Sequence, residues 1–304
     1  MNFRQNKIKL MASVGLLLAA LIWGFAFVVV KNSLDQIPPV YMLAFRFTIA
    51  SIGLGCIFYN RLKKINKDNI LSGIILGVFL YFGYLLQTIG CIYTTAGKNA
   101  FLTTIYVVIV PFLYWAISKK RPDAYCIASA IMAIVGIGLL SLNGNMVINI
   151  GDVLTLLCGF AYAVHLIFIN KFSEHQDPII LTFIQIFVAA ALSWMMAPIM
   201  DGSFPMEVTK PDMLGGMLYL GICSTMIAFL LQNICQQYTE PSTAALLLSM
   251  ESVFGAVFSI IFLGEFLTNK MLIGCAFIFT AVIMAETKFD FIKQTFKKRS
   301  TNNA

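Results

Sequence analysis

The stretch LMASVGLLLAALIWGFAFVVV, residues 10–30, carries no charged side chain between Lys9 and Lys31. A bilayer core about 30 Å thick requires about 20 apolar residues for each spanning helix, and this stretch is long enough to supply them. Runs of this kind recur about ten times along the 304 residues. Helices of water-soluble domains keep one polar face and do not produce such a series. The sequence therefore predicts an all-α integral membrane protein.

The apolar runs predict ten transmembrane helices joined by short connections, as in packed helix bundles. The tenth run is the weakest, because its charge-free part extends only from Met271 to Ala285. The expected spans are residues 11–31, 39–59, 69–91, 97–118, 124–142, 152–171, 178–199, 213–236, 241–263 and 269–286.

Composition excludes several classes of protein. Hydrophobic residues make up 59% of the chain and charged residues 12%, whereas soluble domains have about 45–50% and about 25%. The net charge of +7 does not indicate nucleic-acid binding, because the basic residues cluster in short connections between apolar runs. The seven cysteines lie in or beside apolar runs without a C-x-x-C pair, so we expect no metal site, and we expect no cofactor.

The distribution of basic residues predicts the orientation in the membrane. Ten spans place both termini on one side, and that side collects sixteen of the 21 Lys and Arg residues. The opposite side collects four, and Arg46 lies within a span. The positive-inside rule therefore predicts a multi-pass plasma-membrane protein with both termini cytoplasmic.

The chain also contains an internal repeat. At an offset of 145, residues 85–87 (Leu-Leu-Gln) align with residues 230–232, and six of the ten positions from 85 to 94 match. At smaller offsets, residues 24–26 (Gly-Phe-Ala) align with residues 159–161. Polar and aromatic positions match as well as aliphatic ones, which argues against chance similarity.

Each half of this repeat holds five spans, and an odd number inverts the second half relative to the first. We therefore expect two inverted five-helix repeats, which are typical of secondary transporters. The predicted domains are residues 1–146, residues 147–290 and a basic cytoplasmic tail over residues 291–304.

Several motifs identify a related family. They are WGFAF (23–27), FRF (45–47), TTAGKNAFLT (94–103), YVVIVP (106–111), LSMESVF (248–254) and LGE (263–265). These motifs resemble the drug/metabolite transporter superfamily, specifically its ten-helix EamA-type exporters. The resemblance covers about residues 11–286 and implies export of a small solute, with proton coupling. Ser252 replaces the proline that often follows the span-nine glutamate in that family, which puts a kink in span nine in doubt, whereas Pro111 predicts a kink in span four.

Two ionisable residues within spans are the main candidates for a functional site, because charges inside a bilayer are costly and usually face the bundle interior. Glu251 lies near the middle of span nine, where it is predicted to titrate a proton or contact a cation. The alternative is a structural carboxylate that ties two helices together. Arg46 in span two is predicted to bind an anionic solute group or pair with Glu251 as a gate. Its alternative role is to stabilise the fold.

Aromatic and amide residues at mid-span positions complete the predicted substrate pathway. Aromatic side chains in a central cavity can hold an apolar or cationic solute, although each is also compatible with core packing. His165 is either titratable or simply a satisfied buried histidine. These further candidates are Trp23, Tyr106, Tyr162, His165, Gln87, Gln185 and Gln232.

The resulting prediction is a secondary transporter that exports small metabolites, amino acids or amphiphilic solutes by alternating access. Its expected partners are a small-molecule solute and the lipid bilayer, with protons as a further candidate. Nucleic acid is not an expected partner. A monomer and a homodimer both remain open. No catalytic residue is assigned and no enzyme is expected. The alternatives are an integral membrane enzyme acting on a lipid-linked substrate and a non-transporting scaffold or sensor.

Overall fold

The computed structural model describes residues 3–119, 121–141, 149–264, 266 and 269–287, and this part of the chain is helical without strands. Glu265 and the predicted basic tail, residues 291–304, lie outside the described residues. In the first half the helices are α1 (Phe3–Ser33), α2 (Pro39–Ile57), α3 (Tyr59–Leu62), α4 (Lys67–Ile92), α5 (Ala96–Thr103), α6 (Tyr106–Ser118) and α7 (Ala124–Ser141). The second half contains α8 (Ile150–Ser173), α9 (Pro178–Met200), the 3-10 turn η1 (Met206–Thr209), α10 (Pro211–Leu218), the π-helix η2 (Tyr219–Ile227), α11 (Ala228–Gln236), α12 (Pro241–Leu248), α13 (Met250–Leu263) and α14 (Asn269–Thr287).

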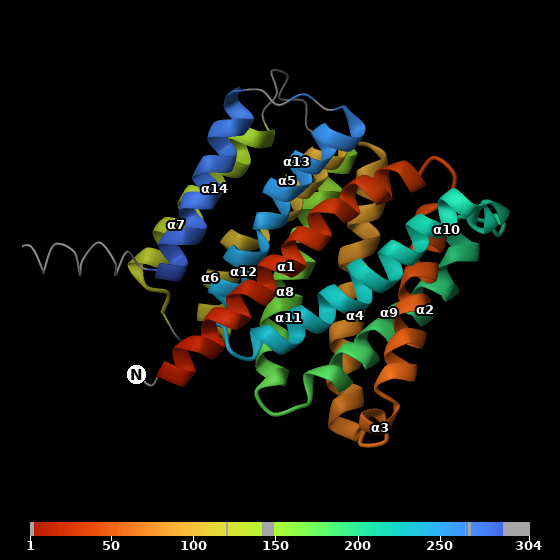
Figure 1. The fold of residues 1–304 in the computed structure, drawn as a ribbon, viewed down its shortest axis with the longest axis horizontal. Coiled ribbons are helices and arrows are strands. Elements are labelled where there is room, and N and C mark those ends of the chain that lie inside the picture. Colours follow the sequence, from red (N-terminus) through yellow and green to blue (C-terminus); the bar gives the residue numbers. More distant parts are fainter. Residues whose placement is uncertain (1–2, 120, 142–148, 265, 267–268, 288–304) are drawn as a thin grey trace, which may run out of the picture.

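Within the described residues, eight helical segments are long and apolar enough to cross a membrane, and two shorter apolar helices accompany them. The shorter ones belong to α7 and α14, where the fifth and tenth spans were expected. These two helices pack against each other at one side of the bundle (Figure 1). The all-α membrane fold predicted from the apolar runs is therefore confirmed.

Two of the expected spans are broken at equivalent positions. Span four changes from α5 to α6 at Thr104, and span nine changes from α12 to α13 at Ser249. The Thr104 hydroxyl donates to the Phe101 carbonyl at 2.8 Å, and the Ser249 hydroxyl donates to the Leu246 carbonyl at 2.7 Å. Hydroxyl groups that bond to a carbonyl of the preceding turn compete with the helical ladder and commonly accompany such a break.

These breaks correct the expectation that a bend depends on proline. Pro111 lies inside α6 rather than at the break of span four. Span nine breaks at Ser249, although Ser252 stands where the family often has proline. Broken helices at the centre of a membrane protein are tolerated where they line a cavity.

The two halves pack as an inverted pair related by an approximate two-fold axis. Helix α1 contacts α13, and its repeat equivalent α8 contacts α5 and α6. In the same way α4 contacts α9, whereas α2 contacts η2. These contacts of the first half are thus repeated with the roles of the halves exchanged, which is the behaviour of a two-fold axis.

Glycines show the same symmetry at the level of single atoms. A Cβ at Gly77 would meet the Gln185 carbonyl at 2.8 Å, and a Cβ at Gly221 would meet the Arg46 carbonyl at 3.3 Å. Arg46 and Gln185 are repeat equivalents at an offset of 139. The Gly73-x-x-x-Gly77 motif therefore brings α4 close to α9 within one chain, as glycine pairs do in membrane helices.

Candidate functional site

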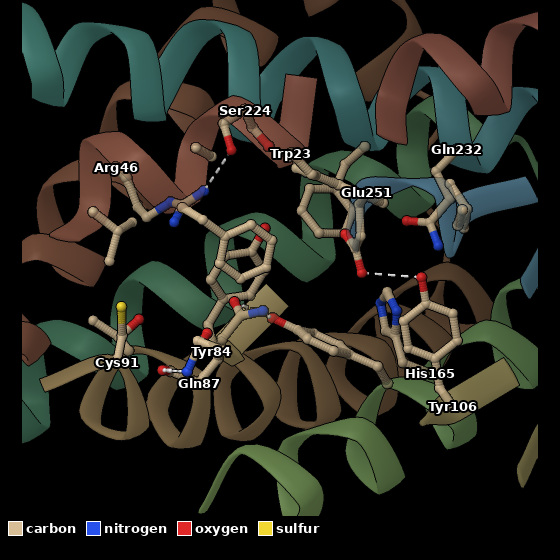
Figure 2. A pocket seen from close by; sticks show the side chains of 18 of the residues that line it. Trp23, Arg46, Tyr84, Gln87, Cys91, Tyr106, His165, Ser224, Gln232 and Glu251 are labelled. Carbon is tan, nitrogen blue, oxygen red and sulfur yellow. Dashed lines mark hydrogen bonds between the residues drawn. The ribbon is translucent and has the colours of Figure 1, made fainter. Parts of the chain in front are cut away.

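A cavity lies between the two halves (Figure 2), and together with its opening to the outside it holds about 630 Å³ of space. It is lined by residues of both halves, and eight of the nine predicted pathway residues are among them. These eight are Trp23, Arg46, Gln87, Tyr106, Tyr162, His165, Gln232 and Glu251. The geometry thus brings together side chains that are more than 200 residues apart in the sequence.

Glu251 and Tyr106 mark the position of the symmetry axis in this cavity. The Tyr106 hydroxyl donates to Oε1 of Glu251 at 3.0 Å, and the two residues are 145 positions apart (Figure 2). They are therefore repeat equivalents, and equivalent residues touch only where both lie near the axis. Glu251 is 5% exposed and Tyr106 is 3% exposed, so this contact is in the centre of the protein.

The irregular turns of spans four and nine lie directly before Tyr106 and Glu251. Tyr106 is the first residue of α6, and Glu251 lies in the first turn of α13. Ser249 itself keeps a right-handed helical backbone, and its N–H still bonds to the Ala245 carbonyl at 2.9 Å, so the break is a local irregularity of one turn directly before Glu251.

Arg46 faces the cavity from α2 and is 2% exposed. Its Nη2 donates to the Ser224 hydroxyl at 2.9 Å, and its Nε donates to the Thr225 hydroxyl at 3.0 Å. The face of the Tyr84 ring lies 4.4 Å from the guanidinium carbon, within the range of a cation–π contact. Among the described residues Arg46 bonds to these neutral hydroxyl groups and Glu251 bonds to Tyr106, without an ion pair between Arg46 and Glu251. The role of this pair as a gate stays a prediction.

The π-helix η2 presents the hydroxyl groups that hold Arg46. Thr225 donates its hydroxyl to the Leu220 carbonyl, five residues earlier, at 2.7 Å. The Ser224 carbonyl also accepts the indole N–H of Trp23 at 2.8 Å. A π-helical turn shifts the register of the side chains that follow it, and such turns are frequent at functional sites.

The amide candidates occupy different positions. Gln87 is linked to the Tyr162 hydroxyl at 3.2 Å and to the Thr103 hydroxyl at 3.1 Å. Its repeat equivalent Gln232 also lines the cavity. Gln185 does not line it, but its Oε1 lies 2.7 Å from Nε2 of His165, which does. Gln185 therefore contacts the site through His165.

Several lining residues were missed by the sequence analysis, among them Tyr84, Asn99, Ser224 and Phe229. Tyr84 and Phe229 are repeat equivalents at the offset of 145, one position before the matching Leu-Leu-Gln stretch. Their rings are 5.9 Å apart, and Phe229 is 5.1 Å from Trp23. Aromatic residues at equivalent positions of the repeat would have been the signal for this pair.

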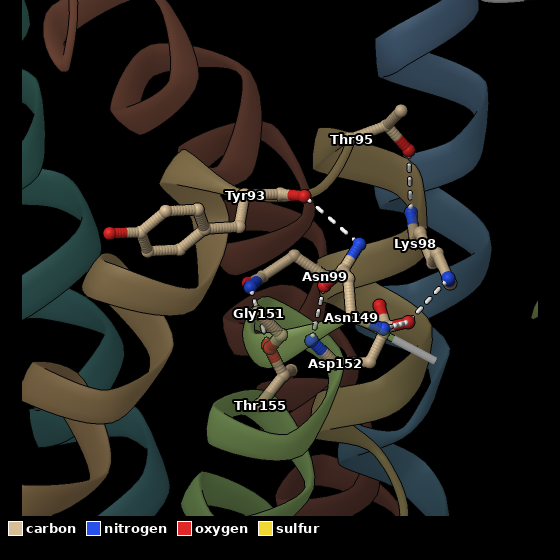
Figure 3. A network of polar contacts seen from close by, with 8 residues as sticks. All are labelled: Tyr93, Thr95, Lys98, Asn99, Asn149, Gly151, Asp152 and Thr155. Carbon is tan, nitrogen blue, oxygen red and sulfur yellow. Dashed lines mark hydrogen bonds and ion pairs between the residues drawn. The ribbon is translucent and has the colours of Figure 1, made fainter. Parts of the chain in front are cut away.

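A polar network joins the two halves beside the cavity (Figure 3). Lys98 Nζ lies 2.7 Å from Oδ2 of Asp152, whose side chain is 4% exposed. Asp152 also forms a capping box with Asn149, which fixes the start of α8. Asn99 donates to the Thr155 hydroxyl at 2.9 Å. The network connects the start of α5 in the first half to the start of α8 in the second.

Known proteins resemble this chain over most of its length. The sequence model of the EamA-like transporter family matches residues 10–142 and again residues 149–287. An Archaeoglobus fulgidus protein named "Uncharacterized transporter" is 35% identical and aligns with 92% of this chain and 87% of its own length. An Escherichia coli K12 protein named "Probable amino-acid metabolite efflux pump" is 26% identical over 88% of this chain and 91% of its own. A crystal structure with 17% identity has the same fold, with a TM-score of 0.72 over 90% of this chain and 97% of that chain.

Proposed function

Because this chain belongs to the EamA-like transporter family of the drug/metabolite transporter superfamily, we propose that it is a secondary transporter that exports small metabolites, amino acids or amphiphilic solutes by alternating access. It acts in the plasma membrane with both termini in the cytoplasm. The basic residues of its connections support this orientation. The name of the Escherichia coli relative supports amino-acid metabolites as cargo and efflux as the direction.

One observation carries this proposal: the cavity lies at the axis that relates the two halves. Tyr106 and Glu251, which are repeat equivalents, face each other in it across 3.0 Å. A site on such an axis stays in place while the two repeats rock against each other, so it is open to each side in turn. The eight predicted pathway residues that line this cavity act as the contacts of the solute.

Protons are the second partner in the proposal. Among the residues that line the cavity, Glu251 is the one that has a carboxylic acid side chain. A carboxyl group that takes up a proton on one side of the membrane and releases it on the other links solute movement to a proton gradient. Proton entry into the cell then drives the solute outward.

The test is counterflow in proteoliposomes loaded with unlabelled solute, with uptake of the labelled solute followed over time. The panel comprises amino acids, organic acids, amines and cationic amphiphiles. The proposal predicts saturable exchange of at least one class, absent from protein-free liposomes. Folded protein that exchanges none of them would contradict it.

A further inference from the structure

The turn that follows α6 holds a lysine in a backbone conformation that favours glycine. Helix α6 ends at Ser118, and Lys119 then has a φ of 59°, in the left-handed region. Its N–H bonds to the Trp115 carbonyl at 2.9 Å and closes the helix. A side chain costs free energy in this conformation, because its Cβ lies too close to the following carbonyl oxygen. The sequence therefore keeps a lysine here against a local cost.

The equivalent turn in the other half contains a glycine at this position. Gly264 lies 145 positions after Lys119, follows α13 directly and has a φ of 67°. Because the halves are inverted, the two turns lie at opposite faces of the membrane. Residues 119–123 contain three basic side chains and one acidic, whereas residues 264–268 contain one acidic and no basic side chain. One backbone shape thus carries opposite charge at the two faces.

The basic side chains of the α6 turn are directed away from the protein. Lys119 and Arg121 are both exposed, and within the part of the chain that the structure describes neither has an ionic partner. The guanidinium carbon of Arg121 lies 5.5 Å from the centre of the Trp115 ring, within the range of a cation–π contact. The acidic residue, Asp123, accepts the Cys126 N–H at 2.8 Å at the start of α7. A guanidinium stacked on a ring keeps its N–H edge available for a phosphate.

An apolar strip leads from this turn into the membrane. Trp115 is 40% exposed, and Phe112, three residues earlier on the same face of α6, is 49% exposed. A tryptophan at the end of a spanning helix lies at the level of the lipid head groups. The surface therefore has basic groups at head-group level and aromatic rings one helical turn deeper, which is the polarity of a phospholipid.

We propose that the turn after α6 binds an anionic phospholipid. Lys119 and Arg121 hold the phosphate and neutralise the negative charge of the head group. Trp115 lies beside the glycerol region, and one acyl chain runs along Phe112. Under the proposed orientation this turn faces the cytoplasmic leaflet, where anionic lipids attract basic segments next to a spanning helix. The opposite turn, with Gly264 in place of Lys119, does not provide this binding site.

The experiment uses Trp115 as a local reporter. The chain has two other tryptophans, Trp23 and Trp194, so the Trp23→Phe/Trp194→Phe protein fluoresces from Trp115. This protein is reconstituted into vesicles in which either phosphatidylcholine or phosphatidylglycerol carries brominated acyl chains, which quench a tryptophan that they touch. Quenching against lipid composition gives the relative binding constants at this position. Phosphatidylglycerol is expected to bind at least about fivefold more tightly than phosphatidylcholine, the attraction expected from basic residues at an anionic lipid.

A matched pair of variants separates this binding site from the general surface charge. In the Trp115 protein, Lys119→Gly/Arg121→Gln should bring the ratio of the two binding constants close to one. Lys64→Gln/Lys67→Gln is the control, because it removes two exposed positive charges beside α3, which is far from α6 across the bundle (Figure 1). This control should leave the preference for phosphatidylglycerol unchanged.

Thermal unfolding provides a second measurement in protein that keeps all three tryptophans. Phosphatidylglycerol should raise the melting temperature of detergent-solubilised wild-type protein more than phosphatidylcholine does. In phosphatidylcholine, Lys119→Gly should melt above wild type, because glycine adopts the left-handed conformation without strain. The same variant should gain less from phosphatidylglycerol. A general folding defect lowers the melting temperature in both lipids and does not produce these opposite changes.

Two results would overturn the inference. Equal quenching of Trp115 by the two brominated lipids would show that the turn does not select an anionic head group. A loss of preference in the Lys64→Gln/Lys67→Gln control as large as that in Lys119→Gly/Arg121→Gln would show that only diffuse surface charge attracts the lipid. If the protein with Trp115 alone does not fold, equal gains of wild type and Lys119→Gly/Arg121→Gln from phosphatidylglycerol in the melting experiment would overturn it.

Discussion

Lys31 and Asn170 make the same pair of contacts in the two halves of this protein. Lys31 Nζ donates to the carbonyl groups of Cys91 and Thr94, both at 2.8 Å. Asn170 Nδ2 lies 3.4 Å from the carbonyl groups of Gln236 and Thr239. Lys31 and Asn170 are 139 positions apart, whereas the two pairs of carbonyl residues are related by 145.

The inverted repeat places these two contacts at opposite ends of the bundle, where α1 and α8 end (Figure 1). The lysine contact is charged and short, and the asparagine contact is neutral and long. Hydrogen bonds from a charged donor are about twice as strong as neutral ones. The end of the bundle that contains Lys31 is therefore held together more firmly than the end that contains Asn170.

Lys31→Met should consequently loosen one end of the protein. The variant keeps an unbranched apolar stem, one atom shorter, but removes both charged bonds, and we expect a loss of about 2 kcal/mol in the free energy of unfolding. Hydrogen exchange of residues 91–95 should accelerate. Asn170→Leu is the matched control. We expect it to lower the free energy of unfolding by less and to accelerate hydrogen exchange only at residues 236–239. Equal effects of the two variants would contradict the difference in strength.

The Lys98–Asp152 pair should matter more than its single contact suggests. Lys98→Met leaves a carboxylate that is 4% exposed without its cation, and we expect a loss of about 1–3 kcal/mol in unfolding free energy. The double variant with Asp152→Asn should recover part of it, because Asn retains an oxygen for the helix cap.

Arg61→Met serves as the control for that experiment. The Arg61–Asp177 pair has a similar length of 2.9 Å, but its side chains are 56% and 29% exposed. Exposed pairs contribute about 0–1 kcal/mol. A loss at Arg61 as large as that at Lys98 would show that burial is not the deciding factor.

Gly77→Ala should disturb the packing of the two halves. The added Cβ would lie 2.6 Å from the Val188 Cβ and 2.8 Å from the Gln185 carbonyl, and the backbone cannot move aside as a flexible side chain would. We expect a loss of about 1–3 kcal/mol in unfolding free energy. Gly215→Ala is the control, because a Cβ there meets nothing within 4 Å. A stable Gly77→Ala protein would contradict the close approach of α4 and α9.

Glu251→Gln should separate exchange from proton coupling. An amide cannot take up a proton, so a pH gradient should no longer drive accumulation, whereas exchange at saturating solute concentration persists. Tyr106→Phe removes the hydrogen bond of 3.0 Å but keeps the carboxyl group, and its transport should still respond to the pH gradient. The measurement is solute flux in proteoliposomes with and without the gradient. If the response to pH is unchanged in Glu251→Gln, another group carries the proton.

Much of the candidate site was readable from the sequence because polar residues are rare within apolar runs. Arg46 and Glu251 are identified by their position within spans alone, since a charge at membrane depth must face the interior of the bundle. Gln87 and Gln232 are identified by the repeat. Tyr84 and Phe229 carry a weaker signal, because the repeat places aromatic residues at both positions without matching their identity and many other aromatic residues lie in the apolar helices.

The sequence by itself determined the membrane class, the duplication and the orientation expected from charge, because these follow from the local composition of each run and from the comparison of one half with the other. The tertiary structure decided which helical faces meet, where spans four and nine break, and that Arg46 binds Ser224, 178 residues away, instead of Glu251. Those outcomes depend on close packing between helices of different halves. Packing is a property of the assembled bundle, and no single run of residues encodes it.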